Sequence, residues 1–574
     1  MSGFKPPHDE IKFALRVWAG VLPGAGGDGE IDADTIDAVV REAGRFAAQV
    51  LAPIDAVGHR EGCSLLPDGS VRTPSGWCEA YERFVEAGWN TVHFPTSLGG
   101  QGLPAPVSIA VAELFEAANV AFTLALMPFA GVVSLMDRFG TPEQKRRYLP
   151  PLVSGRWSAT LAMTEPQAGT DIGAVQTRAV ETPDGVAIEG QKCMISYGDH
   201  GMNENILHFV LARDPSGTPG VKGLSLYVVP KRPVAQDGSL GERNDVKCIA
   251  VEKKIGIHGS PTTVMQFGGD AGGAWGERLG EPCKGLEQMF VVLNRARLNI
   301  GVFGLASAER AWQAAEAYAN ERVQGVDSEG KHCAIAKHPD VRRMLLEMRC
   351  GVDAIRAVAY YAAGVLERSQ HASDPVAREK ARRRLDLLTP IVKGWGTEAA
   401  FEVASTGVQI AGGIGFMDES VAARCFLDAR VHPIYEGTTG IQALDLALRK
   451  IARDGGEVAG ELLAEIRSTW PEQLRAAGLC DLDGDLTSAL RALDVATSSV
   501  VNRARASAAA VQAISVHYLL MWGTVLSAWL LTTAAAEDRG RQNRARFTIL
   551  HRLPRVHAHL ITIERGAQVV LEPY

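Results

Sequence analysis

Paired cysteines and an excess of positive charge are both missing from this 574-residue sequence. Its nine cysteines stand singly, without a C-x-x-C pair or a companion histidine at the spacing of metal ligands, so no metal site is predicted. Scattered single cysteines are typical of a reducing compartment. The formal net charge is -7 at pH 7, which argues against a nucleic-acid partner because a phosphate-binding surface normally carries a basic excess.

A secretion signal is missing from the opening stretch of the chain. MSGFKPPHDEIKFALRVWAG has no charged segment followed by an uninterrupted apolar run and a cleavage site. We therefore expect the protein to be cytoplasmic.

Charged residues are absent from Ala506 to Ala536, a stretch long enough to cross a bilayer. A membrane helix is one interpretation of this stretch. It is also rich in alanine and serine and contains Gln512, His517 and Gly523, and such interruptions lower the propensity for membrane insertion. We therefore predict a buried helix, or two short helices, of a bundle and no membrane span.

The composition is that of a folded globular protein, with 46% hydrophobic and 22% charged residues. A chain of this length accommodates roughly two to four domains. Residues 1–157 are predicted to form a helical domain, because segments such as Asp34 to Ala52 repeat apolar residues at helical spacing. Within this domain, FPTSLGGQGLP (Phe94 to Pro104) is predicted to be a loop.

Short apolar runs without helical periodicity begin near Ser158. HFVLAR (His208 to Arg213) and LSLYVVP (Leu224 to Pro230) are typical of strands. Because no helical pattern separates these runs, residues 158–280 are predicted to form an antiparallel β-barrel or sandwich between helical regions.

Helical periodicity returns after the predicted β domain, notably over Asn294 to Gln324 and Val341 to Leu366. Residues 281–454 are predicted to form a helical bundle. The Asp454-Gly455-Gly456 break then separates residues 455–574, which are predicted to form an appended helical subdomain. The expected fold class is mainly α with a central antiparallel β domain.

The sharpest chemical signal is a lone carboxylate on a glycine-rich loop in VHPIYEGTTGIQALDLALRKI, Val431 to Ile451. Gly437 follows Glu436 directly and would let a flat ligand approach the backbone closely. A pocket closed by an apolar ligand would raise the pKa of Glu436 by desolvation, which suits a general base. The alternative is that Glu436 caps a helix beginning near Ile441, since acidic residues are favoured at helix N-termini. The motif alone leaves both interpretations open.

Several motifs in a shared order resemble those of the acyl-CoA dehydrogenase family. IYEGT is similar to the catalytic segment, and LAMTEPQAGTDIGAVQTRA (Leu161 to Ala179) and KCMISYG (Lys192 to Gly198) resemble flavin-binding stretches. QIAGGIGF (Gln409 to Phe416) is similar to the segment that contacts the flavin nucleotide from a neighbouring subunit. The likeness spans roughly Asp34 to Ile451, and several ordered motifs are more specific than any one of them.

The resemblance implies a helical domain, a β-barrel and a four-helix bundle, with FAD as the cofactor. Glu436 would be the catalytic base, Thr170 would face the acyl-pantetheine channel, and Arg297 would meet the CoA moiety. The flavin contacts would come from both chains of a homodimer. The residues matched to these contacts are Thr164, Ser196 and Thr438, with Arg322, Gln409, Gly412 and Gly413 acting at the dimer interface.

Five of the flavin-site matches also have a purely structural interpretation. Gly412 and Gly413 would suit a helix-ending turn, and Arg322 would suit a solvated helix face. Thr164 and Ser196 would suit the polar ends of strands. The shared order of the motifs favours the functional interpretation.

Some positions depart from the common family pattern. Met194 stands where a tryptophan is frequent, which puts stacking over the flavin in question. Gly440 replaces a frequent glutamine, and Gln324-Gly325 lacks the usual Phe-Gly. The stretches Asn203 to Lys231 and Glu252 to Thr262, together with the extra C-terminal region, resemble the branch that includes 3-methylmercaptopropionyl-CoA dehydrogenase.

The activity implied by the resemblance is α,β-dehydrogenation of an acyl-CoA thioester. Glu436 would remove the α proton while the β hydrogen leaves as hydride to flavin N5, giving a 2-enoyl-CoA. The Glu436 N–H and a flavin ribityl hydroxyl would bind the thioester oxygen. An electron-transfer flavoprotein would reoxidise the flavin. An acyl-CoA oxidase that uses dioxygen and a non-catalytic flavoprotein that binds acyl groups are the alternatives, and the sequence leaves the acyl chain open.

Overall fold

The computed structural model describes residues 3–21, 32–183, 185–269 and 272–573. Its contacts form two compact units, each built from separate stretches of the chain. The helical unit consists of Met1–Ala48, Pro104–Ala118 and Arg297–Tyr574, and the sheet unit consists of Gln49–Leu103 and Asn119–Ala296. The division into four domains at residues 157, 280 and 454 stays a prediction, because the two units follow contacts and not chain order.

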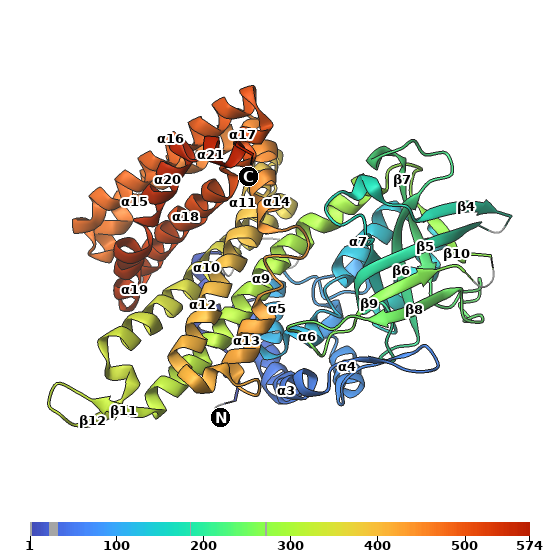
Figure 1. The fold of residues 1–574 in the computed structure, drawn as a ribbon, viewed down its shortest axis with the longest axis horizontal. Helices are drawn as coiled ribbons and strands as arrows, with labels where there is room; N and C mark the ends of the chain where they lie inside the picture. Colours follow the sequence, from blue (N-terminus) through green and yellow to red (C-terminus); the bar gives the residue numbers. More distant parts are fainter. Residues whose placement is uncertain (1–2, 22–31, 184, 270–271, 574) are drawn as a thin grey trace. The chain divides into compact units, whose positions relative to one another are not determined.

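Eight strands form the centre of the sheet unit (Figure 1). They hydrogen-bond in the order β10-β7-β6-β4-β5-β9-β8, with β3 beside β6, and β10 pairs with β5 as well as with β7. This second pairing closes part of the sheet into the predicted barrel. The strands are β3 (Trp157–Ala162), β4 (Arg178–Thr182), β5 (Gly185–Ser196), β6 (Asn205–Arg213), β7 (Leu224–Pro230), β8 (Val246–Val251), β9 (Thr262–Phe267) and β10 (Ala274–Leu279).

Besides a single parallel pair between β4 and β6, Arg178 opposite Arg213, the antiparallel prediction is wrong at β3. This strand runs parallel to β6, with Trp157 opposite Asn205 and Ala162 opposite Val210. The chain between the two strands contains β4 and β5, which is enough to return it to the same end of the sheet. A long connection of this kind leaves no local signal of strand direction in the sequence.

The interior of the barrel is filled by strand residues with branched or aromatic side chains. Ile188, Val210, Tyr227 and Phe267 are all fully buried in one cluster, as expected for side chains that pack well on a pleated surface. The unit is completed by α3 (Ala52–Glu61), α4 (Trp77–Glu86), α6 (Val120–Thr123), α7 (Phe129–Phe139), α8 (Pro142–Val153) and the pair β1 (Ser64–Leu65) and β2 (Val71–Arg72).

Long helices form the helical unit, in which α10 packs against α5, α11, α12 and α18 (Figure 1). The helix predicted over Asn294 to Gln324 ends earlier, at Glu321, and Val323–Val326 forms strand β11 paired with β12 (His332–Ala334). Gly325 has a φ of +76°, which an α-helix does not allow, so the helix could not have continued through it. The helices of the unit are α1 (His8–Val17), α2 (Ala33–Phe46), α5 (Ala105–Ala118), α9 (Gly285–Glu321, which begins in the sheet unit), α10 (Pro339–His371), α11 (Pro375–Pro390), α12 (Gly396–Ala411), α13 (Val421–Ala429) and α14 (Thr439–Leu444).

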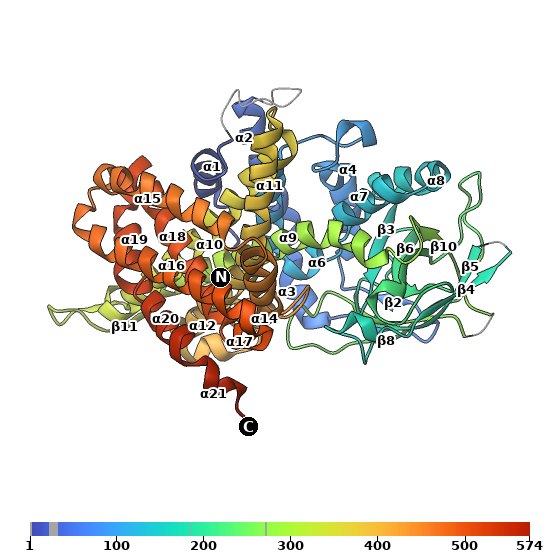
Figure 2. The same ribbon diagram turned by 90° about the horizontal axis from the view of Figure 1, so that it is seen from above.

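The C-terminal region is helical, as predicted, and its helices pack around α18 (Ser515–Glu537) (Figure 2). This helix is long and apolar enough to cross a membrane, but 78% of its apolar 18-residue stretch is buried inside the protein. Such burial is what a core helix requires, so the structure supports the predicted buried helix. The surrounding helices are α15 (Glu457–Ala477), α16 (Asp483–Ala506), α17 (Ala508–Gln512), α19 (Gln542–Phe547), α20 (Arg555–Arg565) and α21 (Ala567–Leu571).

A partly buried network of ion pairs joins the C-terminal region to the rest of the helical unit. Arg544 Nη1 lies 3.0 Å from Asp353 on α10, and Arg541 Nη1 lies 2.5 Å from Glu10 on α1. Arg349, also on α10, lies 2.6 Å from Asp353 and 2.9 Å from Glu10. Because buried charges are costly unless paired, this network fixes how α1, α10 and the start of α19 pack together.

Glu116 on α5 is a buried carboxyl group without such compensation. Only 4% of the residue is exposed, and its Oε2 has no hydrogen-bond partner among the described residues. Burial and the nearby charge of Glu113 raise the pKa of Glu116 well above its usual value. The folded protein therefore holds a proton that the unfolded chain releases above its ordinary pKa, so this group destabilises the fold as pH rises.

Glu116→Gln is accordingly expected to raise the thermal midpoint relative to wild type by more at pH 8 than at pH 5. The amide stays neutral at both pH values, whereas ionisation favours the unfolded wild-type chain at the higher one. Differential scanning calorimetry at the two pH values measures this difference. The exposed residue Glu472 provides the control, Glu472→Gln. A Glu116→Gln effect that is the same at both pH values would contradict the assignment.

Candidate active site

Glu436 lies in the loop between α13 and α14, in an uncommon backbone conformation. Its φ is +53°, in the left-handed region that residues other than glycine enter at a cost, and the φ of Gly437 is +93°. Gln442 Nε2 donates to the carbonyl oxygens of Glu436 and Gly437 at 3.3 and 3.4 Å. Lys393 Nζ donates to the Gly437 oxygen at 2.5 Å. Side chains from two other segments thus hold the loop in a strained conformation, which is typical of a functional site.

The helix-cap interpretation of Glu436 is not the one that the structure adopts. Helix α14 begins at Thr439, two residues before the predicted start, and its N-cap is Thr438. The Thr438 hydroxyl accepts a hydrogen bond from the Ile441 N–H at 3.4 Å. The carboxylate of Glu436 therefore does not cap α14. Thr438 caps the helix instead, in addition to the flavin contact that is predicted for it.

Burial and the neighbouring positive charges shift the pKa of Glu436 in opposite directions. The half-buried side chain has a pKa raised by desolvation, and the positive charges of Arg297 and Lys393 oppose this rise. Arg297 is 7% exposed, and its Nη1 lies 3.5 Å from Asp445 Oδ2. A carboxylate with a raised pKa is a stronger base than one in water, which suits the removal of a weakly acidic proton.

The predicted nucleotide contacts of the helical unit are all exposed. Arg322 follows α9 and donates to Gln324 Oε1 at 3.0 Å. Gly412, with a φ of +59°, ends α12, so the helix-ending turn is present. Gln409, Gly412 and Gly413 share an exposed surface with apolar neighbours, among which Phe416 is 82% exposed. The flavin roles of these residues stay predictions.

Thr164 and Ser196 belong to the sheet unit and lie on adjoining segments. The Cys193 N–H on β5 donates to the Thr164 oxygen at 2.9 Å, and Ser196 ends the same strand. Both residues are half-buried. Met194, two residues before Ser196, has a φ of +58° at an irregularity in the pairing of β5 with β9, and it is 61% exposed. Half-buried threonine and serine residues on these adjoining segments, with an exposed methionine on one of them, suit a flat ring with polar edges, such as that of FAD.

A buried ion pair stabilises the segment that contains Thr164. Lys192 Nζ lies 2.8 Å from Glu165 Oε1 and donates to the Met163 oxygen at 2.9 Å. Glu165 also accepts from the N–H groups of Gln176 and Thr177 at 2.7 and 3.0 Å. These contacts fix the turn after β3, while Thr170 lies exposed further along it.

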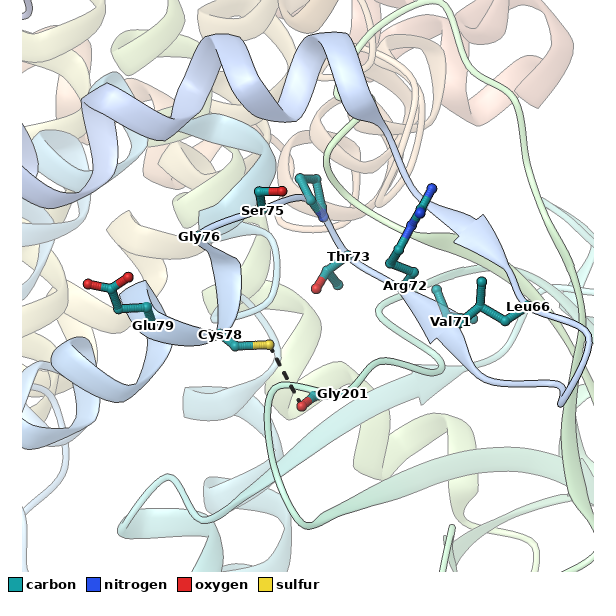
Figure 3. A pocket seen from close by; sticks show the side chains of 10 residues that line it. Leu66, Val71, Arg72, Thr73, Ser75, Gly76, Cys78, Glu79 and Gly201 are labelled. Atoms are coloured by element: carbon teal, nitrogen blue, oxygen red, sulfur yellow. Dashed lines mark hydrogen bonds between the residues drawn. The ribbon is translucent and has the colours of Figure 1, made fainter.

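A shallow open depression elsewhere in the sheet unit contains none of the predicted site residues (Figure 3). It is lined by residues of β2, α4 and their connection, together with Leu66 and Gly201, and Cys78 Sγ contacts the Gly201 oxygen at 3.8 Å. No described feature gives this depression a chemical role.

Sequence reasoning missed Lys393 and Gln442, which donate hydrogen bonds to the loop that carries Glu436 (the base loop), and Asp445, which pairs with Arg297. Lys393 carried a usable signal, because it is a single charged residue in the apolar stretch LLTPIVKGW, Leu387 to Trp395. A lysine inside a helix that is otherwise apolar has to find a partner in the interior. Gln442 and Asp445 carried no comparable signal, since polar residues are common in amphipathic helices.

Comparison with known proteins agrees with these observations. Family profiles of the acyl-CoA dehydrogenase N-terminal, middle and C-terminal domains match residues 34–156, 160–269 and 283–451. A further profile, described as acetyl-CoA dehydrogenase C-terminal like, matches residues 462–573. The 3-methylmercaptopropionyl-CoA dehydrogenase of Ruegeria pomeroyi is 40% identical over 518 residues, which cover 88% of this chain and 86% of that protein.

Two solved structures share the fold. ACDH-11 of Caenorhabditis elegans has a TM-score of 0.79 at 19% identity, covering 100% of this chain and 97% of its own. An acyl-CoA dehydrogenase from Bacillus anthracis, solved as a complex with FAD, has a TM-score of 0.74 at 21% identity, covering 94% of this chain and 89% of its own. The chain therefore belongs to the acyl-CoA dehydrogenase family, a family of FAD-binding oxidoreductases that act on CH–CH bonds.

Proposed function

We propose that the protein catalyses α,β-dehydrogenation of an acyl-CoA thioester and that Glu436 is the base that removes the α proton. The observation that carries this proposal is the state of Glu436. It is a half-buried carboxylate with a raised pKa, held in a left-handed backbone conformation by Lys393 and Gln442. A carboxylate held in this way is suited to a single geometry of proton transfer.

The residues of the chain divide the chemistry between them. Glu436 takes the α proton, and its backbone N–H donates to the thioester oxygen, where negative charge develops. FAD, when bound, supplies the two-electron acceptor for the β hydrogen, and the product is a 2-enoyl-CoA. Thr164 and Ser196 would bind and orient the ring, and Met194 would cover part of its face. Thr170 and Arg297 stay the proposed contacts to the substrate.

Anaerobic addition of acyl-CoA to the purified holoenzyme tests the reaction. We expect at least one member of a panel of straight-chain acyl-CoAs and 3-methylmercaptopropionyl-CoA to bleach the visible absorbance of the oxidised flavin. The rate of bleaching, measured by stopped-flow spectroscopy for each acyl-CoA, then ranks the substrates. If no member of the panel changes the spectrum of a flavin-loaded protein, the dehydrogenase proposal is wrong and a non-catalytic flavoprotein is favoured.

The electron acceptor is a separate part of the proposal. We propose that an electron-transfer flavoprotein, and not dioxygen, reoxidises the flavin, and that the active species is a homodimer in the cytoplasm. Steady-state turnover with a purified electron-transfer flavoprotein is expected to exceed the rate of peroxide formation in air. Stoichiometric peroxide, with no faster turnover when the flavoprotein is added, would identify an oxidase instead.

A further inference from the structure

We propose that Lys393 is a positioning residue for the base, one that holds the Glu436–Gly437 backbone and supplies positive charge to the carboxylate. This inference rests on the proposed function, since it assigns Lys393 a role in the same proton transfer. Lys393 is proposed to act through Glu436 and not by contact with the reacting carbon atoms.

The contact between Lys393 and the base loop is direct. Lys393 lies in the helical turn Ile391–Trp395 between α11 and α12, and its side chain is fully buried. Its Nζ donates to the Gly437 carbonyl oxygen at 2.5 Å, across a separation of 44 residues. This hydrogen bond, with those from Gln442, opposes the relaxation of Glu436 out of its left-handed conformation. Loss of the ammonium would free the loop at the residue next to the base.

The burial of Lys393 calls for a functional explanation. An ammonium group in the interior is costly unless it is closely paired, and the group that accepts the hydrogen bond of Lys393 is the Gly437 carbonyl and not a carboxylate. A methionine or leucine would fill the same apolar space without that cost. The charge therefore costs stability at this position and has to be compensated by what it does for the neighbouring loop.

Charged and titratable groups reach Lys393 from several elements. Glu436 and Glu398 attract it and Arg297 repels it, while burial lowers the pKa of Lys393 to about 7. Arg297 is itself paired with Asp445. His432, buried in the same loop, has a pKa lowered by burial to about 3 and is neutral at working pH. Below pH 7, Lys393 is thus charged and favours the ionised form of Glu436, and this help fades as pH rises through its pKa.

The C-terminal region keeps this segment away from water. A Cβ atom added at Gly523 on α18 would overlap the ring of Trp395, and one added at Gly394 would lie 2.6 Å from Leu519 of the same helix. Glycine at both positions allows α18 to pack closely on the turn that carries Lys393. A dry environment strengthens the interaction between Lys393 and Glu436, because electrostatic attraction grows as the local dielectric falls.

Lys393→Met tests the proposal in the flavin-loaded enzyme. We expect the acid limb of the pH profile of flavin reduction to move upward by about one pH unit, because the base loses a positive neighbour. On that acid limb the rate should fall by up to about 10-fold, since one pH unit is tenfold in the ionised fraction, while KM changes little. Lys393→Arg, which keeps the charge, should recover part of the rate and move the limb back. The exposed residue Lys380 on α11 provides the matched control, Lys380→Met.

The outcomes separate the two proposals. Flavin content and thermal midpoint are measured for each variant, and Lys393→Gln replaces Lys393→Met if the methionine variant does not retain flavin. A wild-type pH profile in a folded neutral variant overturns the role of Lys393 and leaves the proposed function intact. A loss of rate with an unmoved profile also overturns the proposal, because the charge of Lys393 would then contribute nothing to the base. If wild type reduces no flavin with any acyl-CoA, the proposed function itself fails.

Discussion

Glu436→Gln is expected to give a folded, flavin-containing protein whose flavin is reduced by acyl-CoA roughly 10²–10⁴-fold more slowly than in wild type, the usual contribution of a positioned general base. The amide has nearly the same shape as the carboxylate but cannot accept the α proton. The hydrogen bonds that hold the loop end on backbone carbonyls, so they survive the substitution. Anaerobic stopped-flow spectroscopy measures the loss directly.

Two further variants make the result specific. Glu436→Asp keeps a carboxylate on a side chain that is one methylene shorter. We therefore expect a rate of flavin reduction between those of wild type and Glu436→Gln, and this rate should still depend on pH. Glu472→Gln makes the same chemical change at an exposed position and should leave the rate unaltered. A Glu436→Gln enzyme that reduces its flavin at close to the wild-type rate would mean that another group is the base.

Arg356→Met is expected to produce the largest loss of stability. Arg356 is fully buried, and its Nη2 lies 2.6 Å from Glu113 Oε1 and 2.8 Å from Glu309 Oε2. Methionine would fill much of the space but leave Glu113 in the interior without its cation and Glu309 with Arg349 alone, at 3.9 Å. Breaking a buried pair in this way costs about 3–5 kcal/mol of unfolding free energy. We expect a fall of about 5–10 °C in the first thermal transition, measured by calorimetry.

The cause of that loss can be separated from the loss of packing. In Arg356→Met/Glu113→Gln/Glu309→Gln the uncompensated charges are removed, so we expect the triple variant to recover part of the lost midpoint. Arg382→Met on α11, where the arginine is exposed and its ion pairs are solvated, should shift the midpoint by little. Equal destabilisation in the single and triple variants would show that packing, and not charge, dominates at Arg356.

The type of most elements was predictable because the signals are short-range. Apolar spacing indicated strands at His208 to Arg213 and Leu224 to Pro230, which lie within β6 and within the bounds of β7. The end of α9 was misplaced, since the valines after Glu321 continue a helical pattern that Gly325 then interrupts. The parallel direction of β3 was not predictable either, because β4 and β5 intervene before its partner.

The sequence by itself determined the family and the order of the helical and β regions, and it supplied the prediction of Glu436 as the base, because these follow from local patterns and from motifs in a shared order. Only the tertiary structure decided that Lys393 would contact Gly437 from 44 residues away and that Arg356 would meet Glu113 from 243 residues away. A charged residue in an apolar helix shows that a buried partner is needed. Which partner it meets depends on how distant elements pack, and no local periodicity records that.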